Sequence, residues 1–147
     1  MRDARATLNH VLVALFHHIL RIEERSLHEP GVSIREAHVI EAVCGTTDLR
    51  MTSLAQALHI TMGSLSVAVS TLERKGYLLR ERTKDDRRVI NIRPTAAALR
   101  VQEKHKAFHK EMVDAIVGLL DENRLAVLVQ ALNSIDHFLT GKEMEQP

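Results

Sequence analysis

Residues 51–93, MTSLAQALHITMGSLSVAVSTLERKGYLLRERTKDDRRVINIR, contain the pattern that decides the fold. A short helix is predicted from Thr52 or Ser53 to Leu58, followed by a tight connection and a second helix that Thr61 caps and that runs to Lys75. Two short helices joined by a tight turn predict a helix-turn-helix. Apolar residues at helical spacing are expected to face its core: Leu54, Ala57, Leu58, Leu65, Ala68, Val69 and Leu72.

The segment after the second helix changes its period from helix to strand. Gly76 occupies the position where a helix commonly ends on a left-handed residue. Residues 77–82 and 89–93 are predicted to form two strands, joined by a charged turn at 83–88 and ended by Pro94. A small β-hairpin after a helix-turn-helix predicts a winged helix-turn-helix region over residues 33–93.

The N-terminal flank is predicted to be helical. Ser33 and Glu36 have the spacing of a capping box, which opens a helix that continues through Cys44. Before it, a helix is predicted over residues 4–27 from an apolar stripe at helical spacing: Leu8, Leu12, Leu15, Ile19 and Ile22.

The C-terminal flank is predicted to form two further helices. Thr95 is the expected cap of a helix over residues 96–120, and Asp121 is the expected cap of a last helix that Gly141 ends. That last helix carries a heptad-like apolar seam: Leu125, Leu128, Leu132, Ile135 and Leu139.

The terminal helices carry more apolar surface than one small winged domain can cover. Packing them against the same helices of a second copy would bury both seams around a two-fold axis. The sequence therefore predicts a single domain over residues 1–147, mainly α with a small β-hairpin wing. It also predicts a homodimer through the helices at 4–30 and 95–140, which implies a pseudo-palindromic DNA site.

The composition narrows the classes of protein that are expected. Aromatic residues make up only 3% of the 147 residues, which favours helices packed on helices over a sheet-rich fold. Enzyme motifs such as a phosphate loop or a nucleophile elbow are absent from the sequence, so no enzyme is expected. The apolar run at 11–16 is too short to span a membrane. The single cysteine, Cys44, fits a reducing cytoplasm and is expected in the core.

Basic residues concentrate in one window, although the net charge of the chain is only +1. Residues 74–93 hold eight basic and three acidic residues, a net charge of +5. Such a stripe is typical of a phosphate-binding surface, although a solvated hairpin would look similar. Phosphate contacts are expected from Arg50, Arg74, Lys75 and Arg80. A minor-groove contact is expected from Arg87 and Arg88, one of which could instead pair with Asp86.

The second helix of the helix-turn-helix exposes small side chains that can approach base edges. Exposed Ser and Thr residues lower helix propensity, so DNA contact explains them better than a solvated face does. Its first ten residues include no Arg, Asn or Gln, so phosphate contacts and DNA shape are expected to carry much of the affinity. The residues expected to face DNA are Thr61, Gly63, Ser64, Ser66, Val67, Ser70 and Thr71.

Two motifs in this region resemble the MarR family of winged helix-turn-helix regulators. They are residues 72–77, LERKGY, and residues 86–89, DRRV. The order of elements is similar over nearly the whole chain, with Ala98 standing where many members have Gly. The resemblance implies a dimeric transcriptional regulator that binds double-stranded DNA, most often as a repressor.

Within that family the chain resembles the fatty-acid-biosynthesis repressors of Gram-positive bacteria. The similar stretches lie at residues 22–24, 33–38, 61–63 and 105–113. The resemblance implies that acylated carrier protein, or a fatty acyl ligand, promotes repression of lipid-synthesis genes, with no cofactor required. The side chains expected around such a ligand are Phe16, His38, His105, Phe108 and His109.

A zinc sensor is an alternative regulator, suggested by the nine histidines. His105 and His109 are four residues apart and share one helix face. His38 with Glu24 or His28 could complete a tetrahedral set, and zinc-responsive MarR members are similar in this respect. A chance pair of histidines on a solvated helix is the plainer explanation.

Two further classes are weighed against these. A peroxide sensor needs a reactive thiol near the first helix, which Cys44 does not fit. A winged-helix adaptor would not bind DNA, and changing Arg87 and Arg88 together to Ala would leave its function intact. In a DNA-binding regulator the same change is expected to lower affinity for all sequences and to flatten the salt dependence of binding.

Overall fold

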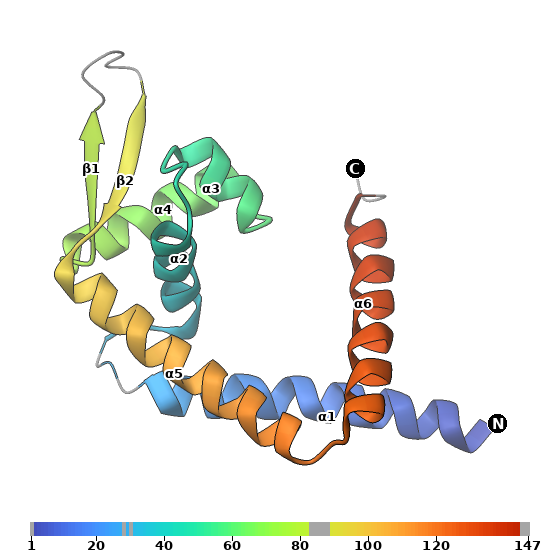
Figure 1. Cartoon of the computed structure of the whole chain (residues 1–147). Helices are drawn as coiled ribbons and strands as arrows, with labels where there is room; N and C mark the ends of the chain where they lie inside the picture. Colours follow the sequence, from blue (N-terminus) through green and yellow to red (C-terminus); the bar gives the residue numbers. More distant parts are fainter. Residues whose placement is uncertain (1, 28, 30, 83–88, 145–147) are drawn as a thin grey trace. The chain divides into compact units, whose positions relative to one another are not determined.

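The structure, a computed structural model, describes residues 2–27, 29, 31–82 and 89–144 (Figure 1). The chain forms two compact units, residues 1–108 and 109–147. The described residues are mainly helical with one β-hairpin, which confirms the predicted fold class. The elements are α1 (Arg2–Leu27), α2 (Ile34–Gly45), α3 (Met51–Ala57), α4 (Met62–Arg74), β1 (Leu78–Arg82), β2 (Ile90–Pro94), α5 (Ala96–Gly118) and α6 (Glu122–Met144).

Hydrogen-bonded caps start two helices as the sequence predicts. Ser33 Oγ accepts the N–H of Glu36 at 3.3 Å, and the Glu36 carboxylate accepts the N–H of Ser33 at 2.8 Å, which completes the capping box of α2. Thr61 Oγ1 accepts the N–H of Ser64 at 3.1 Å and caps α4. These bonds satisfy N–H groups that the start of a helix leaves without a helical partner. The start of each helix is therefore fixed by local sequence.

The start of α3 is fixed differently. The helix begins at Met51, slightly before the predicted start at Thr52 or Ser53. Arg50 precedes it and makes no side-chain cap, but its backbone pairs with Asn91 in β2. The wing therefore helps to hold the segment that enters α3, and helix signals in the sequence do not reveal such a contact.

The core of the first unit includes residues from α2, α3, α4, the hairpin and the beginning of α5. The prediction that Ala57 faces this core is wrong. The buried face of α3 is centred between Leu54 and Ala55, about 110° around the helix from the exposed Ala57. Cys44 is half-buried against the core, and burial raises the pKa of its thiol. The largest fully buried aliphatic side chains are Ile40, Leu54, Leu65, Leu72, Leu78, Ile92, Val43, Val69 and Val101.

α3 and α4 end in the same backbone motif with different residues at the left-handed position. After α4, Gly76 has a φ of 81°, and the N–H of Tyr77 donates to the carbonyl five residues earlier at 2.9 Å. After α3, His59 has a φ of 52°, and the N–H of Ile60 donates to the carbonyl five residues earlier at 3.1 Å. Both are Schellman endings. The left-handed conformation is unstrained for Gly76 but costs about 1–2 kcal/mol for a residue with a Cβ such as His59.

The wing is an antiparallel hairpin in which Leu78 of β1 lies opposite Pro94 of β2. Each strand begins one residue later than predicted, and Pro94 is the last residue of β2 rather than the residue after it. The N–H of Ile92 donates to the carbonyl of Leu49 at 2.9 Å, which ties β2 to the segment before α3. The predicted turn at residues 83–88 lies outside the described residues.

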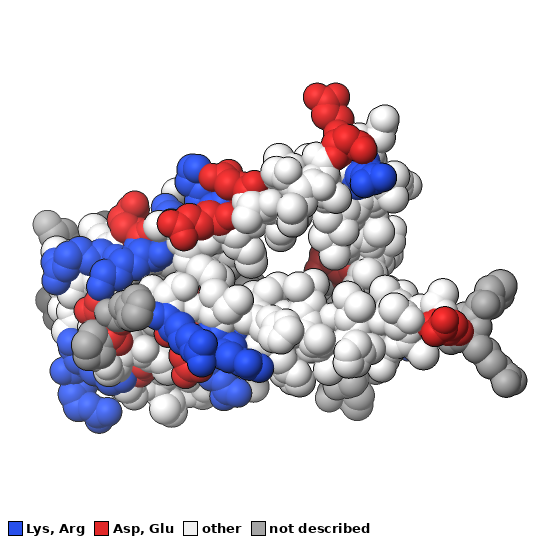
Figure 2. Space-filling view, turned by 90° about the horizontal axis from the view of Figure 1, so that it is seen from below, with Lys and Arg blue, Asp and Glu red and all other residues white. Residues whose placement is uncertain are grey.

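α1 leaves most of its apolar side chains exposed. Among its described side chains only Glu23 and Leu27 are buried. Residues 6–20 contain no Lys, Arg, Asp or Glu, and Figure 2 shows a long uncharged stretch on this helix, with Lys and Arg gathered at the other end of the unit. In the described part of the chain, no helix combines the length and the hydropathy of a membrane span. A long uncharged helix surface of this kind is typical of a protein interface.

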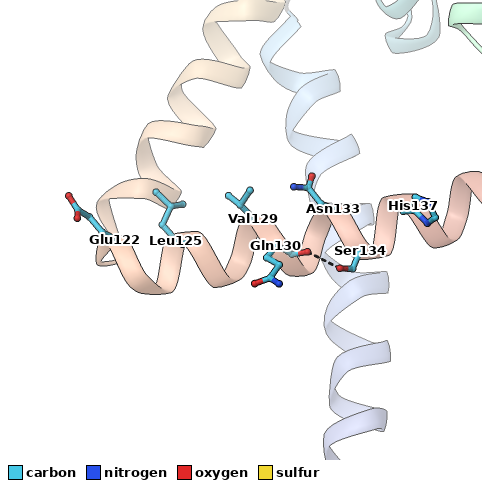
Figure 3. A pocket seen from close by; sticks show the side chains of 8 residues that line it. Glu122, Leu125, Val129, Gln130, Asn133, Ser134 and His137 are labelled. Atoms are coloured by element: carbon cyan, nitrogen blue, oxygen red, sulfur yellow. Dashed lines mark hydrogen bonds between the residues drawn. The ribbon is translucent and has the colours of Figure 1, made fainter.

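The second unit contains the end of α5 and all of α6. α6 continues to Met144, so the prediction that it ends at Gly141 is wrong. A glycine weakens a helix by about 1 kcal/mol without stopping it. A hollow of about 820 Å³ runs along α6, where Leu125 and Val129 point to the same side (Figure 3). The residues of the predicted heptad seam are half-buried or exposed in the single chain: Leu125, Leu128, Leu132, Ile135 and Leu139.

Candidate nucleic-acid interface

One face of α4 presents small polar side chains to solvent, as predicted. Val67 lies among them with 69% of its surface exposed, so this face also offers an apolar side chain to a partner. Ser70 Oγ donates to the carbonyl of Ser66 at 2.8 Å, so part of this face is already ordered. Thr71 is half-buried. The exposed members of the predicted set are Thr61, Gly63, Ser64, Ser66, Val67 and Ser70.

A groove of about 760 Å³ lies between α3, α4 and the wing. It brings together two predicted phosphate-binding residues, Arg50 and Arg80, although they are thirty positions apart in the sequence. Serine hydroxyls from α4 line the same groove, so hydrogen-bond donors from three elements converge there. The lining residues are Arg50, Met51, Thr52, Met62, Ser66, Ser70, Arg80, Val89 and Ile90.

Each of these arginines is held by its own carboxylate. Asp48 accepts two hydrogen bonds from the Arg50 side chain, at 2.8 Å from Nε and 2.5 Å from Nη2. Glu73 accepts from Nη1 of Arg80 at 2.7 Å. The sequence interpretation missed both acids, although Asp48 is only two residues from its partner. Glu73 lies on the helix and Arg80 on a strand, so local spacing does not indicate their contact.

Lys75 lies in a different environment from the one expected for a phosphate contact. Its ammonium donates to the carboxylate of Glu36 at 2.7 and 2.9 Å and to the carbonyl of Gly31 at 2.5 Å, so it joins the end of α4 to the start of α2. Partial burial opposes ionisation of Glu36, but hydrogen bonds from Lys75 and Ser33 hold its pKa below the usual range. Arg74 is exposed. Arg87 and Arg88 lie outside the described residues.

The segment between α1 and α2 is also held by the wing and by α5. Lys104 donates to Glu29 Oε2 at 2.7 Å, and the hydroxyl of Tyr77 donates to Glu29 Oε1 at 3.2 Å. The hydrogen bond from Lys104 is the main reason that the pKa of Glu29 is lowered. A displacement of α1 relative to α5 would therefore disturb the residue that leads into β1.

A buried carboxylate lies between two imidazoles behind this region. Glu23 Oε1 is 2.5 Å from Nε2 of His105 and 3.2 Å from Nε2 of His38, and the two rings are 5.3 Å apart between centroids. Glu41 Oε2 lies 3.3 Å from Nδ1 of His105. Burial opposes ionisation of Glu23, but the hydrogen bonds to His105 and His38 keep its pKa below the usual value. The cluster joins α1, α2 and α5.

The carboxylate of this cluster is not the one expected from the sequence. Glu24, named as a metal ligand, is exposed, whereas Glu23 is buried. Glu23 lies one helical turn before the buried Leu27, and this spacing is the signal that could have identified it. The apolar stripe misled the prediction because its last member, Ile22, is exposed and faces away from the core of the unit.

The side chains predicted to surround an acyl ligand are only partly assembled. His38 and His105 meet, as described. Phe16 is 61% exposed on α1, with its ring against His17. Phe108 and His109 are half-buried on α5, where His109 follows His105 by one helical turn.

The helix-turn-helix, the wing and the groove between them define a winged-helix regulator of the DNA-binding type. The sequence model of the MarR family matches residues 31–89. FabT of Streptococcus pneumoniae, solved in complex with DNA, is 31% identical with a TM-score of 0.87, over 93% of this chain and 98% of FabT. The chain belongs to the MarR family of transcriptional regulators, which confirms the predicted family and a regulator rather than an enzyme.

Other relatives are more distant. The regulators YhjH and MhqR of Bacillus subtilis are 23% and 22% identical over 61% and 76% of this chain. The match spans about half the length of YhjH, 51%, and 77% of MhqR. The MepR–DNA complex of S. aureus is 20% identical with a TM-score of 0.74, over 86% of this chain and 94% of MepR, and supports the fold.

Proposed function

We propose that this MarR-type regulator is a cytoplasmic, dimeric repressor of lipid-synthesis genes that responds to acylated carrier protein or a fatty acyl ligand. The observation that carries the proposal is the similarity to FabT along almost the whole chain. It agrees with the resemblance of four separate stretches to the fatty-acid-biosynthesis repressors. The helix-turn-helix and wing supply the DNA contacts, and the helices outside them supply dimerisation and effector response.

Contacts to DNA would combine weak base readout with phosphate binding. α4 fits a major groove with Val67 and its serine neighbours against base edges, where a valine methyl can contact a thymine methyl. Arg50 lies at the edge of that face, where a phosphate would pass. Small side chains on α4 discriminate weakly, so DNA shape contributes much of the specificity.

Dimerisation would cover the exposed apolar surfaces of the terminal helices. The charge-free stretch of α1 and the hollow along α6 are such surfaces (Figures 2 and 3). A two-fold pair places two copies of α4 on successive turns of DNA, which matches a pseudo-palindromic operator.

An effector acts only if it binds the DNA-competent and DNA-incompetent dimers with different affinity. The cluster of Glu23, His38 and His105 joins three helices, so a ligand that separates these side chains would shift α2 relative to α1 and α5. Because Lys75 ties α4 to the start of α2, that shift would reach the recognition helix.

Zinc is a second candidate effector, favoured by the same cluster. A buried carboxylate shared by two imidazoles supplies the nitrogen and oxygen donors that zinc binds. His109, one helical turn after His105, is the expected further ligand. Bound zinc would hold α1, α2 and α5 together through these side chains.

The purified protein should first be analysed by native mass spectrometry with parallel metal analysis. A dimer that carries fatty acid, or captures acylated carrier protein, supports the lipid-synthesis function. Stoichiometric zinc that is lost in Glu23→Gln and His105→Ala, and kept in the exposed control Glu24→Gln, supports the zinc sensor instead. A dimer with neither would leave DNA binding as the function and the effector open.

DNA binding should be measured with a duplex recovered by the wild-type protein from a random-sequence pool. Added acylated carrier protein is expected to tighten binding to this duplex. Failure of the wild-type dimer to enrich any sequence would contradict the regulator function and favour a winged-helix adaptor.

A further inference from the structure

Arg50 and Arg80 share a groove but differ in how much of each guanidinium remains available. Arg80 donates to Glu73, to Ser70 Oγ at 2.9 Å and to the carbonyl of Ser66 at 3.2 Å, and its side chain is 28% exposed. Arg50 makes its side-chain hydrogen bonds to Asp48, and its side chain is 58% exposed. Arg80 therefore braces the wing against α4, whereas Arg50 keeps one edge of its guanidinium towards the outside.

The carboxylate beside Arg50 is itself fixed by the protein. Ser53 Oγ donates to Asp48 Oδ2 at 2.6 Å, and the N–H of Arg50 donates to Asp48 Oδ1 at 3.3 Å. The N–H of Asp48 donates to Thr46 Oγ1 at 3.1 Å. Hydrogen bonds from Arg50 and Ser53 hold the pKa of Asp48 far below the usual range, so the carboxylate is ionised at neutral pH.

The backbone of Arg50 is held as firmly as its side chain. Its pairing with Asn91 and the hydrogen bond from Ile92 to Leu49 attach this segment to β2. Asp48 then takes the Nε edge of the guanidinium in a planar, two-bond contact that fixes its orientation. The remaining N–H groups project from a fixed point beside the DNA-facing surface of α4.

We propose that Asp48 is a positioning residue that orients the Arg50 guanidinium for contact with a DNA phosphate at the edge of the groove between α3 and the wing. The inference rests on the proposed DNA contact of this face. A preorganised arginine loses less side-chain freedom on binding than a mobile one, so the acid increases affinity despite its negative charge. If Asp48 merely neutralised Arg50, removing its charge would instead tighten DNA binding.

The test is a double-mutant cycle on the duplex selected by the wild-type dimer, with affinity measured at several salt concentrations. Arg50→Ala is expected to weaken binding about tenfold and to lower the magnitude of the salt slope by about 1.8, as for one lost phosphate contact in each of the two subunits. Asp48→Asn is expected to weaken binding about fivefold in the wild-type background and less than about twofold in the Arg50→Ala background.

Two controls separate orientation from charge and from folding. Arg50→Lys keeps the charge but cannot make the planar contact, so it is expected to lose affinity with little change in salt slope. Ser53→Ala removes another donor to the same carboxylate but keeps the two bonds between Asp48 and Arg50, so it is expected to lose less affinity than Asp48→Asn does.

Three results would overturn the inference. They are tighter or unchanged binding by Asp48→Asn, equal losses from Asp48→Asn with and without Arg50, and full affinity in Arg50→Lys. Equal losses would mean that Asp48 acts through the stability of the loop. Each of these leaves the regulator function intact, because that function fails only if the wild-type dimer selects no duplex.

Discussion

The winged region and the terminal helices differ in how much of their apolar surface a single chain buries. Between α2 and the start of α5, large aliphatic side chains are buried within one chain, and caps and ion pairs fix each element. In α1 and α6, most apolar side chains of the single chain remain exposed. The first region buries its apolar core within one chain, whereas the second completes its packing only with a second copy, as proposed.

The largest expected effect concerns the buried core of the winged region. Leu72→Ala removes a fully buried side chain from the middle of the core and should lower the free energy of unfolding by about 2–5 kcal/mol. Urea denaturation followed by circular dichroism measures it. The control Leu79→Ala, at an exposed position of β1, should cost less than about 0.5 kcal/mol, and a similar loss at both positions would contradict the described core.

The next largest effect concerns the exposed apolar stripe of α1 and its proposed role in dimerisation. Leu12→Glu with Leu15→Glu places two charges on the apolar stripe of α1 and should convert the dimer to monomers while the winged region stays folded. Operator affinity should fall at least about 100-fold. Analytical ultracentrifugation and fluorescence anisotropy report the two quantities. His10→Glu with His17→Glu, on the opposite side of the helix by spacing, should remain dimeric, and monomers in both variants would place the interface elsewhere.

A smaller effect concerns the link between α2 and α4. Glu36→Gln should lower the free energy of unfolding by about 1 kcal/mol at pH 7, since it weakens the capping box and the bond to Lys75. Because folding lowers the pKa of Glu36, its stabilisation is complete above the reference value of 4.5 and is lost as the pH falls below it. The free energies of unfolding of the wild type and of Glu36→Gln, measured from about pH 3 to about pH 7, should therefore converge at the acidic end. A constant difference would contradict an ionised Glu36 as the cause.

The smallest expected effect sharpens the comparison of the two Schellman endings. His59→Gly relieves the left-handed strain after α3 but adds flexibility to the unfolded chain, so the net gain should be about 0.5 kcal/mol. Gly76→Ala should lose about 1 kcal/mol at the equivalent position after α4. Thermal denaturation of both variants measures these changes in stability. A destabilised His59→Gly would show that the histidine side chain contributes more than its backbone strain costs.

Local signals account for what the sequence predicted correctly. Ser33, Thr61 and Gly76 act on backbone groups within a few residues, so their spacing suffices to place helix ends. The exposed face of α4 follows from its helical period in the same way.

The predictions from the sequence fail where contacts between residues far apart in the chain determine the position of a side chain. Lys75 meets Glu36 across 39 residues and His105 meets Glu23 across 82, and no local period encodes either partner. The sequence predicts Glu24 rather than the buried Glu23 as a ligand because the apolar stripe of α1, which suggests a core-facing side, is largely exposed in the single chain. The sequence predicts a helix end at Gly141 because glycine often ends helices, yet Gly141 lacks the left-handed conformation that ends α4 at Gly76.

The charge-free stretch of α1 has a consequence for regulation in the cell. Under the proposed pairing, the active species is a dimer whose abundance at low expression varies with the square of the protein concentration. Halving synthesis would then lower the dimer concentration, and with it the occupancy of a sparsely filled operator, by up to about fourfold. Under this pairing, a helix left uncovered in one chain would make repression respond more than proportionally to the amount of protein, even when the effector is constant.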